Sequence, residues 1–407
     1  MMKLTLAVPF LAAGALAAVV NQTTCGDTTY QYTGLAGYGF IPSNATDKHG
    51  DTIGGIGSSI AIDQSSWRKL GKDGYAGTLY TIPDRGCPRS FRLKSLNPQH
   101  PPQTPISPAT PHTQASPPLP VATYTGNGFG GPGKGGRRIS VDAEGLALDP
   151  KGGFWVSDEY GPYVYKFSAS GRMEHAIQPP QAFLPRRNGS ISFNSNTPPL
   201  YNANEIPVPE DTESGRANNQ GFEGLTISAD GKTLYTLIQS ALDQEGGPSK
   251  SSRATARLIA YDISTSKPKY IHEWVVILPK FDDPAKSKPV VAAQSEIHQL
   301  PSGDFLVLAR DSGRGHGQTE SQSLYRHADV FSIKGGASDV KGKKDYDSAK
   351  GAVASSKGDG GDEYILFSMS DNDFITQDGH MNFGKFRYSD ESGFDLDTQI
   401  LAFHLKI

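Results

Sequence analysis

The sequence predicts an all-β protein with a β-propeller-like fold. The chain has 46 glycines and 29 prolines among its 407 residues, a content that disfavours long helices and favours tight turns. Short strand-like runs separated by such turns recur along it. One hairpin pattern also appears three times, as in the repeated sheets of a propeller. A β-sandwich is the alternative fold, and it would lack the recurring hairpin.

Residues 1–18 have the layout of a secretory signal peptide. Lys3 provides a short positive region, an almost entirely apolar run extends from Leu4 to Val20, and Ala15-Leu16-Ala17 matches the small-x-small cleavage rule. This run is at the short end of the range that spans a membrane. We therefore expect cleavage and a secreted, extracellular protein, with residues 19–407 forming one domain.

Export makes modification of the surface and a disulfide plausible. Three acceptor sequons for N-glycosylation begin at Asn21, Asn44 and Asn188. The two cysteines, Cys25 and Cys87, can pair in an oxidising compartment, but their spacing alone does not establish the pairing.

Three segments are predicted to be β-hairpins with the same plan. Each runs through a strand, a glycine-containing turn and a second strand, and they span Leu146–Val156, Leu225–Leu237 and Ile297–Leu308. A glutamate stands just before or at the start of each hairpin: Glu144, Glu223 and Glu296. Each hairpin ends in polar residues: Asp158-Glu159, Gln239-Ser240 and Arg310-Asp311.

Because the two ends of an antiparallel hairpin lie at the same edge, each glutamate should lie beside the polar end of its own hairpin. If the first strand of each blade lines the central channel, all three glutamates converge at one mouth. Asp371, in a polar segment after a strand, is expected to join them. Single strand-end acids more often serve turns and ion pairs, but the threefold recurrence favours a shared site.

A group of carboxylates stays ionised only beside a compensating charge, and a hard cation such as Ca²⁺ prefers oxygen ligands. We therefore predict a divalent metal, calcium, held by four acids: Glu144, Glu223, Glu296 and Asp371. The candidate catalytic residues lie at the ends of two hairpins and in the following loop: Asp158, Glu159, Arg310, Asp311 and His316. For His316 a plain exposed loop histidine is the alternative.

Two segments interrupt the strand pattern. Residues 88–120 contain ten prolines and are expected to form a disordered insertion, and residues 335–361 are expected to form a flexible, solvated loop. Lys and Arg number 39 against 42 Asp and Glu, a balance that argues against a nucleic-acid partner. We expect a small anionic or ester substrate, a monomer, and no membrane attachment after signal cleavage.

Four long runs resemble the phytase-like family, also called "esterase-like activity of phytase", which is common among secreted fungal proteins. They are Val141–Phe167, Arg216–Ser240, Ala292–Gln318 and Ser370–Phe386, and Thr33–Asp63 adds a fifth. The resemblance implies a propeller-like fold and a hydrolase of phosphate or carboxylic esters.

The chain departs from the family pattern after Gly86 and before Asp362. We interpret these departures as a retained intron and lost exon sequence, which would leave one blade incomplete; a continuous cDNA encoding these residues would contradict this. Two alternatives to the esterase or phosphatase function remain open. One is a metal-dependent lactonase, and the other is a non-catalytic propeller that binds carbohydrate or protein and contains structural calcium.

Overall fold

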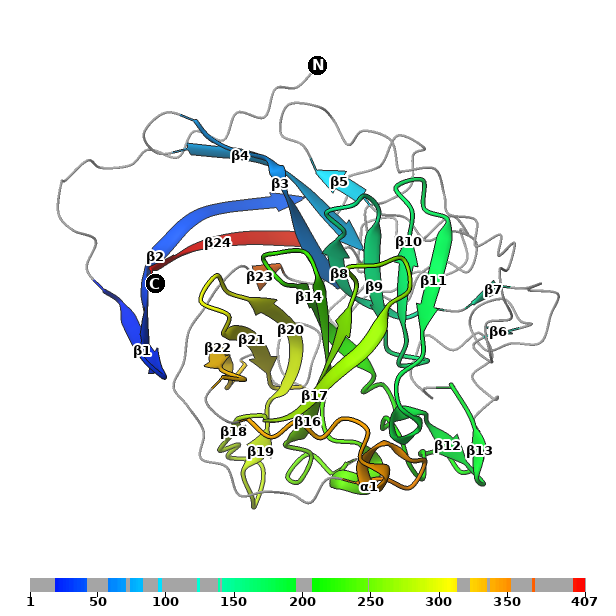
Figure 1. Cartoon of the computed structure of the whole chain (residues 1–407). Helices are drawn as coiled ribbons and strands as arrows, with labels where there is room; N and C mark the ends of the chain where they lie inside the picture. Colours follow the sequence, from blue (N-terminus) through cyan, green and yellow to red (C-terminus); the bar gives the residue numbers. More distant parts are fainter. Residues whose placement is uncertain are drawn as a thin grey trace, which may run out of the picture.

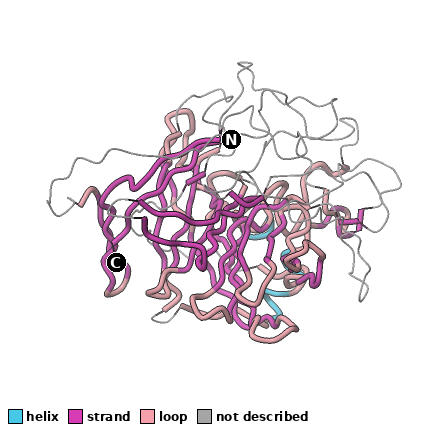
Figure 2. The backbone as a smooth tube through the Cα atoms, turned by 90° about the horizontal axis from the view of Figure 1, so that it is seen from above, coloured by secondary structure: helices cyan, strands magenta, loops and turns pink. Residues whose placement is uncertain are grey.

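The computed structural model describes residues 19–41, 58–70, 74–82, 94–96, 123–124, 138–139, 141–194, 207–247, 249–312, 323–334, 337–352, 368–369 and 398–406. Strands dominate this part of the chain, and its single α-helix is a four-residue turn, α1 (Lys344–Asp347). The prediction of an all-β protein is confirmed. Figure 2 shows strands making up most of the described backbone, with the few helical turns on one side.

The strands form antiparallel sheets, and most of these follow the chain order. The sheet that joins the two ends of the chain contains β1 (Asn21–Cys25), β2 (Thr28–Ile41), β24 (Thr398–Lys406) and β23 (Ser368–Met369). Two further sheets also have four strands: β8 (Ala143–Leu148), β9 (Phe154–Asp158), β10 (Val164–Phe167) and β11 (Met173–Ile177); and β14 (Phe222–Ile227), β15 (Thr233–Ile238), β16 (Thr255–Asp262) and β17 (Lys269–Ile277).

Two further sheets have three strands among the described residues: β3 (Ser59–Leu70), β4 (Gly74–Ile82) and β5 (Lys94–Leu96); and β20 (Ala293–Gln299), β21 (Phe305–Arg310) and β22 (Arg326–Phe331). Small two-stranded ribbons complete the fold: β6 (Thr123–Tyr124) with β7 (Arg138–Ile139), β12 (Arg186–Arg187) with β13 (Ser190–Ile191), and β18 (Lys280–Phe281) with β19 (Val290–Val291).

The first strands of successive sheets pack against one another. β8 contacts β3 on one side and β14 on the other, and β14 in turn contacts β20 (Figure 1). The remaining strands of each sheet follow outward from these inner strands. Meandering sheets whose first strands meet at the centre are the arrangement of propeller blades, so the fold is propeller-like.

The turns that define the repeated hairpins are present as predicted. Asp230-Gly231 joins β14 to β15, with Gly231 at a φ of 70°, a left-handed conformation that favours glycine. In the turn from β8 to β9, the Asp149 amide donates to the Gly153 carbonyl at 3.1 Å. Gly303, at a φ of 88°, occupies the corresponding turn from β20 to β21.

Apolar side chains between neighbouring sheets form the core. The largest cluster joins the β8–β11, β14–β17 and β20–β22 sheets and includes Trp155, Phe222, Leu237 and Phe305. Because the inner strands are covered on both sides, β8 and β14 are buried along nearly their whole length. This continuous burial fixes the backbone from which the candidate site residues project.

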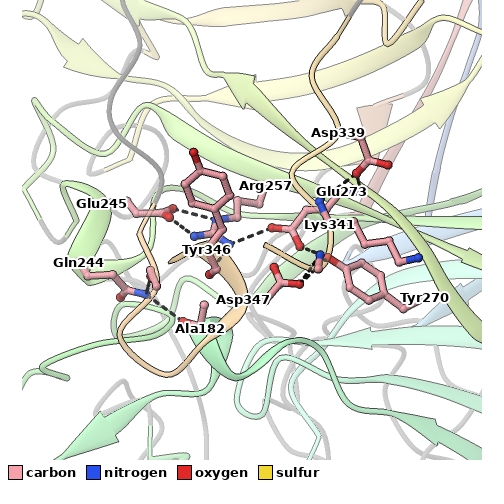
Figure 3. Close-up of polar contacts among 12 residues, drawn as sticks. Ala182, Gln244, Glu245, Arg257, Tyr270, Glu273, Asp339, Lys341, Tyr346 and Asp347 are labelled. Atoms are coloured by element: carbon pink, nitrogen blue, oxygen red, sulfur yellow. Dashed lines mark hydrogen bonds and ion pairs between the residues drawn. The ribbon is translucent and has the colours of Figure 1, made fainter. Parts of the chain in front are cut away.

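Part of the predicted loop 335–361 is tied to the β14–β17 sheet. The Val340 amide donates to the Glu273 carbonyl at 2.8 Å, and the Tyr346 carbonyl accepts from Arg257 at 3.1 Å. α1 packs on η1 (Gln181–Phe183), and Gln244 in η2 (Asp243–Glu245) donates to the carbonyls of Ala182 and Gly351, both at 3.0 Å (Figure 3). In the proline-rich stretch, the structure describes only β5, which pairs with β4.

Candidate functional site

The three predicted glutamates lie on inner strands of successive sheets: Glu144 in β8, Glu223 in β14 and Glu296 in β20. β8 and β14 come very close beside the first two. A Cβ on Gly145 would lie 2.4 Å from the Glu223 carbonyl oxygen, so only glycine fits there. The glycine that follows Glu144 therefore allows the two inner strands to approach each other.

The Glu296 carboxylate and the Ser59 hydroxyl together connect four inner strands. The carboxylate accepts the Ser59 hydroxyl from β3 at 2.6 Å, the Leu225 amide from β14 at 3.1 Å and the Ile297 amide of its own strand at 2.9 Å. The Ser59 oxygen also accepts the Leu146 amide of β8 at 3.0 Å. Removal from water raises the pKa of Glu296 to about 7, and these donors only partly offset that rise.

Two adjacent serines connect Glu144 to Glu296. The Ser58 hydroxyl donates to Glu144 at 2.9 Å, and the Ser59 hydroxyl donates to Glu296. Glu223 is held differently, because its carboxylate accepts the Gln239 amide and its carbonyl accepts the Ser157 hydroxyl at 2.8 Å. The structure therefore places residues of hairpins far apart in the sequence on neighbouring inner strands, with different partners for each glutamate.

A buried group of three carboxylates lies at the end of the β8–β9 hairpin where β8 begins and β9 ends. Carboxylate oxygens of Asp142, Glu144 and Glu159 all lie within 4.8 Å of one another, and the three residues are at most 8% exposed. Asp142 and Glu144 are two positions apart along the chain. The Glu159 amide donates to the Asp142 carbonyl at 2.9 Å, which fixes the third acid beside them.

Asp158 lies next to this group and holds the backbone of Asp142. It is fully buried and accepts the amides of Asp142 and Tyr160, each at 3.0 Å, and the Tyr165 hydroxyl at 3.1 Å. Burial raises its pKa to about 7 in spite of these donors. Asp158 thus fixes the backbone at Asp142, one member of the cluster.

The donor set of the cluster fits a divalent metal. Three carboxylates this close together in a buried place need compensating positive charge to remain ionised. Oxygen ligands suit hard divalent cations, and Ca²⁺ completes its six to eight ligands with carbonyls and waters. The cluster could therefore hold a divalent cation.

The structure does not bring all the predicted ligands and catalytic residues together. In the described part of the chain, the three-acid cluster includes neither Glu223 nor Glu296. Arg310 is exposed, and its Nε donates to Ser295 at 2.7 Å. Asp311 accepts the Ser323 hydroxyl and, at 2.9 Å, the Leu324 amide. In the β20–β21 ladder Glu296 pairs with Leu308, whereas Arg310 pairs with Ala293. The last two residues of that hairpin, Arg310 and Asp311, therefore lie beyond the glutamate.

Several predictions fall on residues outside the described part. These are the signal peptide 1–18, Asn44, Cys87, His316 and Asp371. Asn21 and Asn188 are exposed, as glycosylation requires, and Cys25 is half-buried. Among the described residues, no helix is long and apolar enough to cross a bilayer.

Sequence reasoning missed Asp142 as a member of the cluster. The available signal was its position two residues before Glu144, because alternate residues of a strand point to the same face.

A model of the family described as "Phytase-like: Esterase-like activity of phytase" matches residues 53–358. The chain belongs to the phytase-like family. An uncharacterized secreted protein of Arthroderma benhamiae is 44% identical over an alignment of 464 positions, which covers 89% of this chain and 90% of the relative. The alignment is longer than this phytase-like chain, so the relative has segments with no counterpart here. The prediction of a secreted protein is confirmed.

Solved structures similar to this phytase-like protein include a luciferin-regenerating enzyme, with a TM-score of 0.31, 9% identity, and coverage of 92% of this chain and 87% of that one. A putative 6-phosphogluconolactonase from Bacteroides uniformis has a TM-score of 0.29 and 11% identity, with 79% and 80% covered. Virginiamycin B lyase from Staphylococcus aureus has a TM-score of 0.29 and 8% identity, with 75% and 74% covered.

Proposed function

We propose that this chain is a secreted hydrolase that cleaves phosphate or carboxylic esters at the mouth formed by its inner strands, with calcium as the divalent metal. The observation that carries the proposal is the buried cluster of Asp142, Glu144 and Glu159. Membership of the phytase-like family supports ester hydrolysis as the reaction.

Asp142, Glu144 and Glu159 would hold the metal through their carboxylate oxygens. A divalent cation in such a site polarises a phosphoryl or carbonyl oxygen, or lowers the pKa of a bound water. Asp158 keeps the Asp142 backbone in place through a 3.0 Å hydrogen bond and acts as a positioning residue. The Ser58 hydroxyl, directly before the neighbouring inner strand β3, orients Glu144.

The remaining residues have roles in the same proposal. Arg310 lies at the end of β21, where its charge can attract an anionic substrate. Asp311 follows it and orders the chain at residues 323–324. His316 is proposed as a general acid or base. His316→Ala should then lower turnover more than binding if the histidine transfers a proton.

The direct test measures phosphate release from phytate and hydrolysis of a nitrophenyl ester, with and without a chelator. Glu144→Gln removes one predicted ligand, and Glu174→Gln, on the exposed face of β11, is the matched control. We expect activity that the chelator and Glu144→Gln abolish and that Glu174→Gln leaves unchanged.

Other outcomes would point to other functions. Destabilisation by the chelator without turnover of either substrate would indicate a binding protein with structural calcium. Hydrolysis of a lactone, with neither ester cleaved, would indicate a lactonase. Turnover that survives both the chelator and Glu144→Gln would contradict a metal-dependent reaction at this cluster.

A further inference from the structure

A buried arginine that has no acidic partner among the described residues lies near the same cluster. Arg253 is 7% exposed, and its Nη1 donates to the neutral Gln220 side chain at 3.0 Å. Its Nε is buried and has no hydrogen-bond partner among the described residues. Burying an unpaired cation is costly, so a retained guanidinium of this kind is suited to an anion that arrives from outside.

Backbone contacts place Arg253 beside the inner strands. Its carbonyl accepts the Ala241 amide at 3.0 Å, just after the end of β15. Gln220, its side-chain partner, precedes Gly221, and a Cβ on that glycine would lie 2.3 Å from the Glu159 carbonyl oxygen. Arg253 therefore reaches a residue next to the backbone of the acidic cluster.

Two further cationic side chains, those of Arg310 and Lys250, lie near Arg253. Burial and the neighbouring charge of Arg310 lower the pKa of Arg253 to about 10, which indicates that the two guanidinium groups are close. Lys250 donates to the Ser312 hydroxyl at 3.0 Å, two positions after Arg310. Burial and the charges of Arg253 and Lys286 lower the pKa of this lysine as well. Neither arginine forms an ion pair with a carboxylate among the described residues.

We propose that Arg253, together with Arg310 and Lys250, binds the phosphate group of an anionic ester; this inference rests on the proposed hydrolase function and narrows its substrate class. Guanidinium groups match the oxygens of a tetrahedral anion and bind it through charge-assisted hydrogen bonds. Arg253 contributes a buried Nε that has no partner among the described residues, while Arg310 and Lys250 add charge from the exposed side. A neutral carboxylic ester would make no use of this group.

The test is the binding of inorganic phosphate to the full chain, measured by calorimetry with calcium and with chelator, and compared with acetate. The variants are Arg253→Gln, Arg253→Lys and Arg310→Gln. Arg172→Gln, on an exposed turn between β10 and β11, is the control. We expect phosphate to bind more tightly than acetate, and Arg253→Gln to weaken phosphate binding by about 10-fold or more, as loss of a charge-assisted contact requires.

Arg253→Lys should weaken binding less than Arg253→Gln, because it keeps the charge, and circular dichroism will verify that each variant is folded. Unchanged phosphate binding in both Arg253→Gln and Arg310→Gln, or no phosphate binding to the wild-type chain under either condition, would overturn the inference. Ester hydrolysis with no phosphate binding would refute this subsite but leave the proposed function standing. Arginine-dependent phosphate binding without any hydrolysis would support this subsite but refute the proposed hydrolase function.

Discussion

Two buried arginines four positions apart have opposite surroundings. Arg257, in β16, is fully buried and donates to Glu245 and, at 2.9 Å, to Glu273, as Figure 3 shows. Arg253, just before β16, has a neutral glutamine as its side-chain partner. A buried cation with two carboxylate partners stabilises the fold, whereas the arginine with no carboxylate partner among the described residues is the one that we propose for ligand binding.

The pKa values of the two arginines are shifted in opposite directions, in agreement with this difference in partners. Burial lowers the pKa of Arg257, but the hydrogen bonds and charges of Glu245 and Glu273 more than offset this and raise it above its ordinary value. For Arg253, burial and Arg310 act together and lower the pKa. Glu245 and Glu273 thus compensate the charge of Arg257, whereas no carboxylate among the described residues compensates the charge of Arg253.

The largest expected effect comes from exchanging each arginine for glutamine. Arg257→Gln leaves Glu245 and Glu273 buried without their cation, and we expect it to lower the free energy of unfolding by about 3–5 kcal/mol. Arg253→Gln should change that free energy by less than about 1 kcal/mol, because it removes a cation that has no acidic partner in the part of the chain that the structure describes. Urea unfolding of the two variants measures both. Equal losses would remove the distinction between the two regions.

The pH dependence of stability tests the inner strands. A glutamate normally has a pKa of 4.5, but folded Glu296 keeps its proton up to about pH 7. The folded state thus binds more protons than the unfolded state between these values, so this residue's contribution to stability falls as the pH rises through that window.

The Glu296→Gln variant should lack this fall, and its stability relative to wild type should rise by up to about 3 kcal/mol between pH 4.5 and 8. Thermal or urea unfolding at several pH values provides the comparison. A constant difference between the variant and the wild type across that range would show that Glu296 titrates normally.

A smaller effect is expected at the edge of the Arg257 network. The Tyr270 hydroxyl donates to Glu273, so Tyr270→Phe removes one hydrogen bond to a charged group. We expect a loss of about 1–3 kcal/mol in the free energy of unfolding, and no change in ester hydrolysis or phosphate binding. Reduced hydrolysis in a variant that remains folded would connect this network to the mouth.

The sequence was sufficient to predict the hairpins and the inner-strand positions of the glutamates, because local turn chemistry and strand alternation determine both. Asp230-Gly231 is an example of such a local signal. The sequence did not predict which acids meet. Glu159 joins Asp142 because of a backbone hydrogen bond between segments 17 positions apart, whereas Glu296 is taken up by donors from other strands.

Arg253 and Arg257 show why the partners of buried charges could not be predicted from the sequence either. Both are arginines near the start of one strand, and nothing local distinguishes them. Arg257 is paired because Glu245 and Glu273 flank it from η2 and β17, and Tyr346 contacts it from a segment 89 positions away. Whether a buried charge is paired depends on such long-range contacts.

The most direct test of the account is a calcium titration of the full chain after removal of bound metal, monitored by calorimetry. We predict saturable binding that Asp142→Asn and Glu144→Gln abolish and that Tyr270→Phe, in the outer network, leaves intact. Absence of calcium binding to the wild-type chain, or equal binding in Glu144→Gln, would contradict the claim that the inner mouth keeps its buried charges for ligands.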